Sequence, residues 1–320
     1  MRKNFALIGA AGYIAPRHMK AIKETGNNLV AALDPYDGIG IMDSHFPQAS
    51  FFTEFERFDR FVDKWHREHE KKIEFVSICS PNYLHDSHIR FALKSGADAI
   101  SEKPLVLNPH NIDQLKIIEQ ETGKKVYNIL QLRLHPSIIA LKERVAKELQ
   151  DDPNKIYDID LTYLTSRGKW YFVSWKGNQE KSGGIASNIG VHFYDMLCWI
   201  FGDVEENIVH LKTPDTNAGF FKLKNATVRW FLSVNYDYIP EGVKVKGLTT
   251  YRSITVDGEE IEFSGGFTDL HTRSYEEILA GNGFGLEEAY GSIRTVSTIR
   301  NKEAIGLQGE FHPFCKKVLN

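Results

Sequence analysis

The stretch "FALIGAAGYIAPRH" at residues 5–18 decides the fold expected for this chain of 320 residues. Its apolar start is typical of a buried parallel strand, and a helical pattern follows. The glycines depart from the usual G-x-G-x-x-G spacing, because Ala11 occupies the middle glycine position, Gly12 comes one residue late and Ile14 stands at the third. Taken alone, the stretch fits a dinucleotide site and a simple strand-to-helix turn about equally well.

Asp34 favours the dinucleotide site. It ends the next apolar stretch, "NLVAALD", 22 residues after Gly12. A carboxylate at this point hydrogen-bonds the adenosine ribose and repels a 2′-phosphate, so it favours NAD over NADP. The alternative is an exposed loop aspartate before Pro35. We expect NAD to contact Gly9, Ala11, Gly12, Tyr13, Ile14 and Asp34.

The first 131 residues alternate between strand-like and helical patterns. Strands are expected at 4–9, 28–34, 73–80, 98–103 and 124–131, with helical patterns at 15–26, 86–95 and 110–122. Right-handed crossovers would bring such strands into one parallel sheet. Residues 1–131 are therefore predicted to form a doubly wound α/β Rossmann domain.

The pattern changes after a helix at 135–150. Strand-like stretches then follow one another at 156–166, 206–213, 219–236 and 252–264, with helices at 184–201, 273–282 and 286–301. The Asp257-Gly258 pair is typical of a hairpin turn. Residues 132–320 are predicted to form an α+β domain built on a large antiparallel sheet.

Composition excludes several classes of protein. The net charge is −3 and no basic run is long enough to follow a nucleic-acid backbone. No apolar run reaches the ~18 residues of a membrane helix. The three cysteines lack the spacing of a zinc site, and we expect no metal. The start of the chain has some character of a signal peptide, but strand, turn and helix account for it better, so a cytoplasmic location is expected.

Polar residues follow two predicted neighbouring strands, in "SICSPNYLH" (77–85) and "SEKPLVLN" (101–108). Ligands of an open parallel sheet bind outside the carboxyl ends of its strands. Pro104 favours an extended backbone at Lys103, which would help this side chain project; the alternative is a solvated surface lysine. The further cofactor-binding candidates are Ser80, Pro81, Asn82, His85, Glu102, Lys103 and Gln131.

The stretch "GGIASNIGVHFYDML" (183–197) places Asn188, His192 and Asp195 on one face of a predicted helix. Catalytic and structural roles for the histidine are about equally compatible with the pattern.

The segment 165–184 carries four cations and four aromatic side chains: Arg167, Lys169, Lys176, Lys181, Trp170, Tyr171, Phe172 and Trp175. Cations suit a diphosphate or a carboxylate, and aromatic faces suit a nucleobase. A UDP-sugar acid has all of these groups. The alternative is a solvated basic loop whose aromatic residues cover the sheet.

These motifs resemble the Gfo/Idh/MocA family of sugar oxidoreductases: "EKP" at 102–104, "SPNYLH" at 80–85, and a helix histidine after a glycine-rich stretch. The resemblance implies a Rossmann domain followed by an open-faced sheet. It also implies that Lys103 and His192 are the catalytic pair. Many members carry Asp where this chain has Asn188; because an amide relays no proton, Asn188 is expected only to orient a sugar hydroxyl.

Longer stretches, among them "TYLTSRGKWYFVSWKG" and "SNIGVHFYD", are similar to a subfamily of UDP-N-acetylglucosaminuronate 3-dehydrogenases. That similarity implies NAD-dependent formation of a 3-keto sugar in lipopolysaccharide O-antigen biosynthesis, coupling to an aminotransferase, 2-oxoglutarate as a possible recycling substrate, and a homotetramer. The residues it implies at the substrate are Lys103, Tyr163, Arg167, Lys176, Asn188 and His192. The alternatives are a dehydrogenase of a free sugar or inositol, and a non-catalytic dinucleotide sensor.

Overall fold

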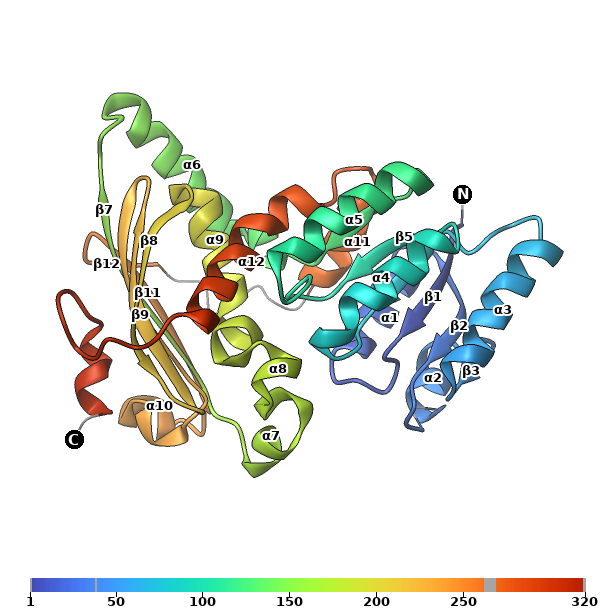
Figure 1. Ribbon diagram of the computed structural model, residues 1–320, viewed down its shortest axis with the longest axis horizontal. Coiled ribbons are helices and arrows are strands. Elements are labelled where there is room, and N and C mark those ends of the chain that lie inside the picture. Colours follow the sequence, from blue (N-terminus) through green and yellow to red (C-terminus); the bar gives the residue numbers. More distant parts are fainter. Residues whose placement is uncertain (1, 38, 262–268, 319–320) are drawn as a thin grey trace. The chain divides into compact units, whose positions relative to one another are not determined.

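The computed structural model describes residues 2–37, 39–261 and 269–318. The chain forms two compact units, Met1–Gln131 with Thr268–Tyr290, and Leu132–Phe267 with Gly291–Asn320 (Figure 1). The predicted boundary at 131 coincides with the end of the first part of unit 1. The assignment of all of 132–320 to a second domain differs from the structure, because the segment that carries Tyr275 returns to the first core, where its ring packs 5.9 Å from that of Phe5.

Unit 1 is built on a six-stranded parallel sheet in the order β3-β2-β1-β4-β5-β6. This confirms the doubly wound fold. All of these strands except the edge strand β3 are mostly buried, because helices cover both faces of such a sheet. Their bounds are β1 Asn4–Ile8, β2 Asn28–Leu33, β3 Ser50–Phe52, β4 Phe75–Ile78, β5 Asp98–Ser101 and β6 Val126–Asn128.

The helices of unit 1 pack in pairs, α1 against α11 and α4 against α5. Tyr275 and Ile278 of α11 lie in the same apolar core as Phe5, Leu7 and Met19. The helices are α1 Ala15–Glu24, α2 Ile39–His45, α3 Phe55–Glu68, η1 Asn82–Leu84, α4 His85–Lys94, α5 Pro109–Thr122, η2 Gln131–Leu134, which begins at the last residue of this part of unit 1, and α11 Leu270–Leu279.

Unit 2 contains a six-stranded sheet in the order β12-β11-β7-β10-β9-β8. It is mostly antiparallel, but β7 and β10 run parallel, which the antiparallel prediction did not include. The hairpin at Asp257-Gly258 is confirmed, with φ of 53° and 81° at its two residues. The strands are β7 Tyr157–Thr165, β8 Val204–Lys212, β9 Thr216–Leu223, β10 Ala226–Ser233, β11 Thr250–Val256 and β12 Glu259–Glu260; residues 262–264 of the predicted last strand lie outside the described residues.

Helices α6 and α9 pack against each other beside this sheet (Figure 1). Tyr194 of α9 meets Phe221 and Trp230 of the sheet edge to face, with ring centroids 5.1 and 5.5 Å away. The other helices of this part are short, apart from α12, which runs across the boundary between the units. The bounds are α6 Pro136–Asp151, α7 Lys169–Val173, η3 Trp175–Gly177, α8 Gln179–Ser182, η4 Ala186–Gly190, α9 Val191–Phe201, η5 Tyr236–Tyr238, α10 Glu241–Lys244, α12 Leu286–Asn301 and η6 Pro313–Lys317.

The opposite face of the second sheet is partly covered by the end of the chain, where sequence analysis found no pattern. Phe231 of β10 packs with Phe314 and His312, and His312 is hydrogen-bonded to Thr162 at 3.0 Å. Elsewhere on this face Arg229 pairs with two aspartates of β7. The end of the chain thus covers part of the face that was predicted to be open, and ion pairs of Arg229 occupy another part of it. Among the described helices, none combines the length and apolarity that a membrane span requires.

Candidate active site

The turn after β1 is too tight for a side chain at Gly9. Its φ is +89°, and a Cβ there would lie 2.6 Å from the carbonyl carbon of Cys79. A Cβ on Gly12 would lie 3.1 Å from the Gly9 carbonyl oxygen. Helix α1 begins three residues after Gly12, with Pro16 in its first turn. The turn therefore presents bare backbone at a helix N-terminus, which is the arrangement that accepts a pyrophosphate.

Asp34 lies at the end of β2 and is buried. Its Oδ2 accepts the backbone N–H of Ala11 at 2.9 Å, and its Oδ1 accepts that of Tyr36, also at 2.9 Å. These two bonds orient the carboxylate against the turn, and each oxygen has a further lone pair for a ribose hydroxyl. The residues present therefore fit NAD. When bound, this cofactor supplies a nicotinamide ring that accepts a hydride.

The loops after β4 and β5 are tied together by His85. Its Nδ1 lies 2.8 Å from the carbonyl oxygen of Pro104 and its Nε2 lies 2.8 Å from that of Ser80. Burial lowers the pKa of His85, against which the two carbonyl contacts act to raise it. The Lys103–Pro104 peptide bond is cis. The ring of His85 thus braces the backbone that carries Lys103, while its part in cofactor binding stays a prediction.

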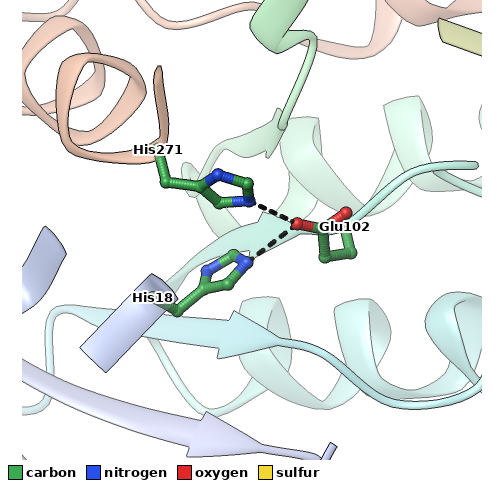
Figure 2. Close-up of side chains that lie close together, drawn as sticks. All are labelled: His18, Glu102 and His271. Carbon is green, nitrogen blue, oxygen red and sulfur yellow. Dashed lines mark hydrogen bonds and ion pairs between the residues drawn. The ribbon is translucent and has the colours of Figure 1, made fainter. Parts of the chain in front are cut away.

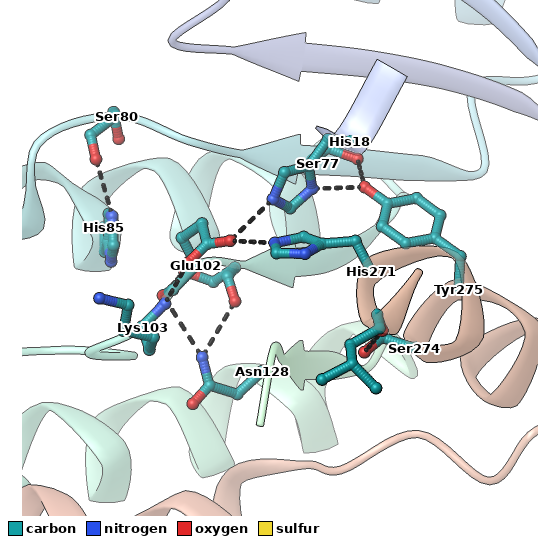
Figure 3. A network of polar contacts seen from close by, with 12 residues as sticks. His18, Ser77, Ser80, His85, Glu102, Lys103, Asn128, His271, Ser274 and Tyr275 are labelled. Atoms are coloured by element: carbon teal, nitrogen blue, oxygen red, sulfur yellow. Dashed lines mark hydrogen bonds and ion pairs between the residues drawn. The ribbon is translucent and has the colours of Figure 1, made fainter. Parts of the chain in front are cut away.

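A second set of hydrogen bonds holds Glu102 (Figures 2 and 3). Its Oε1 lies 3.0 Å from Nε2 of His18 and 2.9 Å from Nε2 of His271. Its Oε2 accepts the backbone N–H of Lys103 at 3.1 Å. Asn128 donates to the carbonyl oxygens of Ser101 and Glu102, at 2.9 and 3.3 Å. Both the side chain and the backbone of Glu102 are therefore held.

The network continues to the hydroxyl of Tyr275, which lies 2.7 Å from Nδ1 of His18 and 2.6 Å from Oγ of Ser77 (Figure 3). Burial alone would raise the pKa of Glu102, but the hydrogen bonds from His18 and His271 outweigh it and hold that pKa well below its usual range. Burial lowers the pKa of His18. A carboxylate on Glu102 beside a neutral ring of His18 is the charge state that these shifts favour.

His18, Glu102 and His271 are also residue types that bind metals, and their potential ligand atoms lie within 4.8 Å of one another. However, both imidazoles direct Nε2 at the same oxygen, so the three side chains satisfy each other through hydrogen bonds. Sequence analysis missed His18, His271 and Tyr275. The spacing of the last two, four residues apart on one helix face, was the available signal.

In unit 2, Asn188 lies in the π-helical turn η4 and His192 in the first turn of α9. The Nδ2 of Asn188 donates to the hydroxyl of Tyr171 at 3.0 Å, and burial raises the pKa of this tyrosine. Gly190 allows the turn to approach the sheet, since a Cβ there would lie 2.5 Å from Leu232. Close packing against the sheet therefore positions the Asn188 and His192 backbone.

Asp195, predicted on the same face, has a structural partner. Its two oxygens accept from Nε and Nη2 of Arg133 at 2.9 and 2.8 Å, and both side chains are buried. This bidentate pair joins η2 to α9.

On the second sheet, the ring of Tyr163 lies 4.7 Å from that of Phe193 and 5.5 Å from the Arg252 guanidinium. Sequence analysis did not select Arg252 as a candidate.

The segment 165–184 forms three short helices, α7, η3 and α8. Tyr171 is buried, whereas Trp170 is 77% exposed. Arg167 is also exposed, and the Lys176 ammonium lies 5.7 Å from the ring of Trp175. The contacts of these cations with a substrate stay predictions.

A parallel sheet with a glycine turn and an acidic residue at the end of β2, joined to a unit with a mostly antiparallel sheet, is typical of a two-domain dinucleotide-binding protein. The chain belongs to the Gfo/Idh/MocA family. Residues 3–129 match its oxidoreductase domain with an NAD-binding Rossmann fold, and residues 154–239 match its C-terminal alpha/beta domain.

Solved structures show the same architecture. The WlbA (WbpB) dehydrogenase from Thermus thermophilus, in complex with NAD and alpha-ketoglutarate, is 52% identical with a TM-score of 0.93, over 98% of this chain and 99% of that one. Its complex with NAD and UDP-GlcNAcA gives 51% identity and 0.92 over the same shares. The WlbA dehydrogenase from Bordetella pertussis, at 19% identity and 0.76 over 97% and 99% of the two chains, shares the fold.

Curated relatives match over shorter stretches. The 2,7-anhydro-N-acetylneuraminate hydratase from Mediterraneibacter gnavus is 26% identical over 64% of this chain and 50% of its own length. The D-glucoside 3-dehydrogenase from Escherichia coli is 25% identical over 41% of this chain and 36% of its own length. The chain spans half or less of the length of the first curated relatives that it matches.

Proposed function

We propose that this protein is an NAD-dependent dehydrogenase that oxidises the 3-hydroxyl of UDP-N-acetyl-D-glucosaminuronic acid to the 3-keto sugar. The observation that carries the proposal is the 51% identity, over 98% of the chain, with a dehydrogenase solved with NAD and UDP-GlcNAcA. The carboxylate of Asp34 beside the glycine turn supports NAD over NADP, because it would repel a 2′-phosphate.

Lys103 and His192 are assigned to the reacting hydroxyl. Oxidation requires that a base remove the hydroxyl proton, and the base must be partly deprotonated near neutral pH. We assign Lys103 to hold the hydroxyl and His192 to accept its proton. Asn188, whose amide is oriented by Tyr171, is assigned to a sugar hydroxyl. An amide accepts no proton under these conditions, so the base must be one of the other two.

The cations of the segment 165–184 support an acidic nucleotide sugar. Arg167 and Lys176 are proposed to bind the diphosphate or the uronate carboxylate. Tyr163 offers an aromatic face on β7, and Arg252 lies over the same ring. Rossmann residues proposed at the cofactor are those of the glycine turn with Asp34, Ser80, Pro81, Asn82, His85, Glu102 and Gln131.

The biological setting follows from the same similarity. We place the enzyme in the cytoplasm, in lipopolysaccharide O-antigen biosynthesis, with an aminotransferase consuming the ketone. The relative solved with NAD and alpha-ketoglutarate supports 2-oxoglutarate as the compound that recycles the cofactor. A homotetramer is proposed, with the uncovered part of the second sheet as its interface; light scattering of the purified protein tests this.

Mass spectrometry tests the reaction. The protein is incubated with UDP-N-acetylglucosaminuronic acid and NAD, with and without 2-oxoglutarate, together with an aminotransferase that draws off the ketone. The expected product is two hydrogens lighter on the sugar ring, and Lys103→Ala should abolish it while still binding NAD. Unchanged sugar nucleotide with intact NAD binding would contradict the substrate, and free sugars and inositols would then be tested.

A further inference from the structure

The carboxylate of Glu102 is a buried charge whose side-chain partners in the network are two imidazoles. His18 and His271 approach one oxygen, and the backbone N–H of Lys103 donates to the other (Figure 3). The backbone N–H is a fixed donor, so Oε2 acts as an acceptor. Three nitrogen donors around one buried carboxyl stabilise its ionised form.

The protons of the network can be placed without giving His18 a charge. If Ser77 donates to the Tyr275 hydroxyl, and Tyr275 donates to Nδ1 of His18, then the proton of neutral His18 lies on Nε2 and points at Glu102. Each hydrogen bond in the series from Ser77 through Tyr275 and His18 to Glu102 then has one donor and one acceptor. Burial, which lowers the pKa of His18, favours the same neutral ring. This part of the network therefore carries the single negative charge of Glu102.

The position of this charge along the sheet decides what it faces. The strand order reverses between β1 and β4, which is the point where a dinucleotide crosses a doubly wound sheet. Asp34 follows β2, so the adenosine half belongs over β1, β2 and β3. The nicotinamide half then belongs over β4, β5 and β6, and Glu102 directly follows β5. The nicotinamide ring is positively charged in the oxidised cofactor and neutral in the reduced one.

We propose that Glu102, held in place by His18 and His271, is a fixed counter-ion for the nicotinamide half of the cofactor site and strengthens binding of oxidised NAD relative to NADH. The proposal rests on the proposed function only for the identity of the cofactor. During alcohol oxidation the C–H bond breaks and its hydride neutralises the ring, while the O–H proton passes to a base of the protein. The total charge of cofactor and base is thus conserved, while the positive charge of the ring itself disappears.

Binding measurements without sugar test this. Dissociation constants of NAD and NADH are measured by calorimetry at pH 8 for the wild type and Glu102→Gln, with the exposed Glu68→Gln on α3 as the matched control. We expect the ratio Kd(NADH)/Kd(NAD) to fall about tenfold in Glu102→Gln, because the variant lacks the negative charge that favours the cationic ring. Glu68→Gln should leave the ratio unchanged. An equal change of both constants in Glu102→Gln, or a rise of the ratio, would overturn the proposal.

If Glu102→Gln does not fold, two substitutions of His271 test whether the charge at Glu102 sets the ratio Kd(NADH)/Kd(NAD). His271→Gln keeps an N–H donor for the carboxylate and should preserve the ratio, whereas His271→Lys places a cation beside Glu102 and should lower it. Equal ratios in these two variants would contradict the role of the charge. The metal content of the purified wild type is measured as a final test. One equivalent of a transition metal bound by His18, Glu102 and His271 would neutralise the charge of Glu102 and overturn the proposal. Failure of the sugar reaction affects none of these measurements.

Discussion

The backbone N–H of Ala11 donates to Oδ2 of Asp34 at 2.9 Å, joining the turn after β1 to the end of β2. Ala11 stands where the usual fingerprint has its middle glycine. Its φ is not in the left-handed region, so alanine is accommodated without strain, and the positive φ belongs to Gly9. The departure from G-x-G-x-x-G therefore leaves the turn intact, and the carboxylate that would bind ribose is oriented by the turn itself.

Replacing Asp34 by Ala should weaken NAD binding about tenfold and reduce the discrimination against NADP. The reason is the loss of both the ribose acceptor and the negative charge that repels a 2′-phosphate. Titration of each dinucleotide against tryptophan fluorescence measures both effects. Asp43→Asn on α2 is the control. An unchanged NAD:NADP ratio in Asp34→Ala would show that cofactor choice is made elsewhere.

Gly9→Ala should lower the free energy of unfolding by about 3 kcal/mol or more, because the new Cβ would meet the Cys79 backbone at 2.6 Å and the φ of +89° disfavours any side chain. Urea unfolding measures the change. In contrast, Gly40→Ala has open space and should stabilise α2 by about 0.5 kcal/mol. Equal stabilities of the two variants would be incompatible with this description of the turn.

The Arg133–Asp195 pair should behave as a buried ion pair rather than as part of the reaction. Asp195→Asn should cost about 3–5 kcal/mol, since it leaves the guanidinium buried without its countercharge. The double variant Arg133→Met, Asp195→Leu should recover most of that loss. Thermal unfolding of the three proteins decides the point. A double variant as unstable as the single one would mean that the pair itself is required.

Stability should fall as the pH is lowered from 6.5 towards 4. Burial lowers the pKa of His88 to about 4, and that of His312 also to about 4. In this window the unfolded chain binds protons that the folded protein excludes, so the free energy of unfolding rises with pH by about 1.4 kcal/mol per pH unit for each such histidine.

His88→Gln separates this contribution. The variant keeps a polar group for Ser80 but no longer titrates, so its urea-unfolding free energy should vary less steeply between pH 4 and 6.5. Wild type and variant with parallel pH profiles would assign the dependence to other groups. Measurements at pH 7.5 serve as the reference, because neither state of the histidine is protonated there to a large extent.

Local patterns were sufficient for most of the fold. Apolar runs of strand length, helices ended by glycine, and the acidic residue at Asp34 predicted the parallel sheet and a dinucleotide site that favours NAD, since each signal depends on neighbours in sequence. The helices at 135–150 and 286–301 and the hairpin at Asp257-Gly258 are confirmed for the same reason. The candidates Asn82, Glu102 and Lys103 were found because strand ends are readable from the pattern.

The partners of those candidates depend on contacts between distant segments. His18 and His271 are 253 positions apart, and Tyr275 reaches the first core only because α11 returns to it after the second sheet. The parallel pairing of β7 with β10, the bidentate pair of Asp195 with Arg133, and the cover that residues 312–314 form over Phe231 are of the same kind. By itself the sequence determined the strand and helix types, the class of cofactor and the candidate side chains, because these are encoded in local spacing. Only the tertiary structure decided which buried polar groups satisfy one another, because burial makes an unpaired charge so costly that its partner is chosen by packing and not by proximity along the chain.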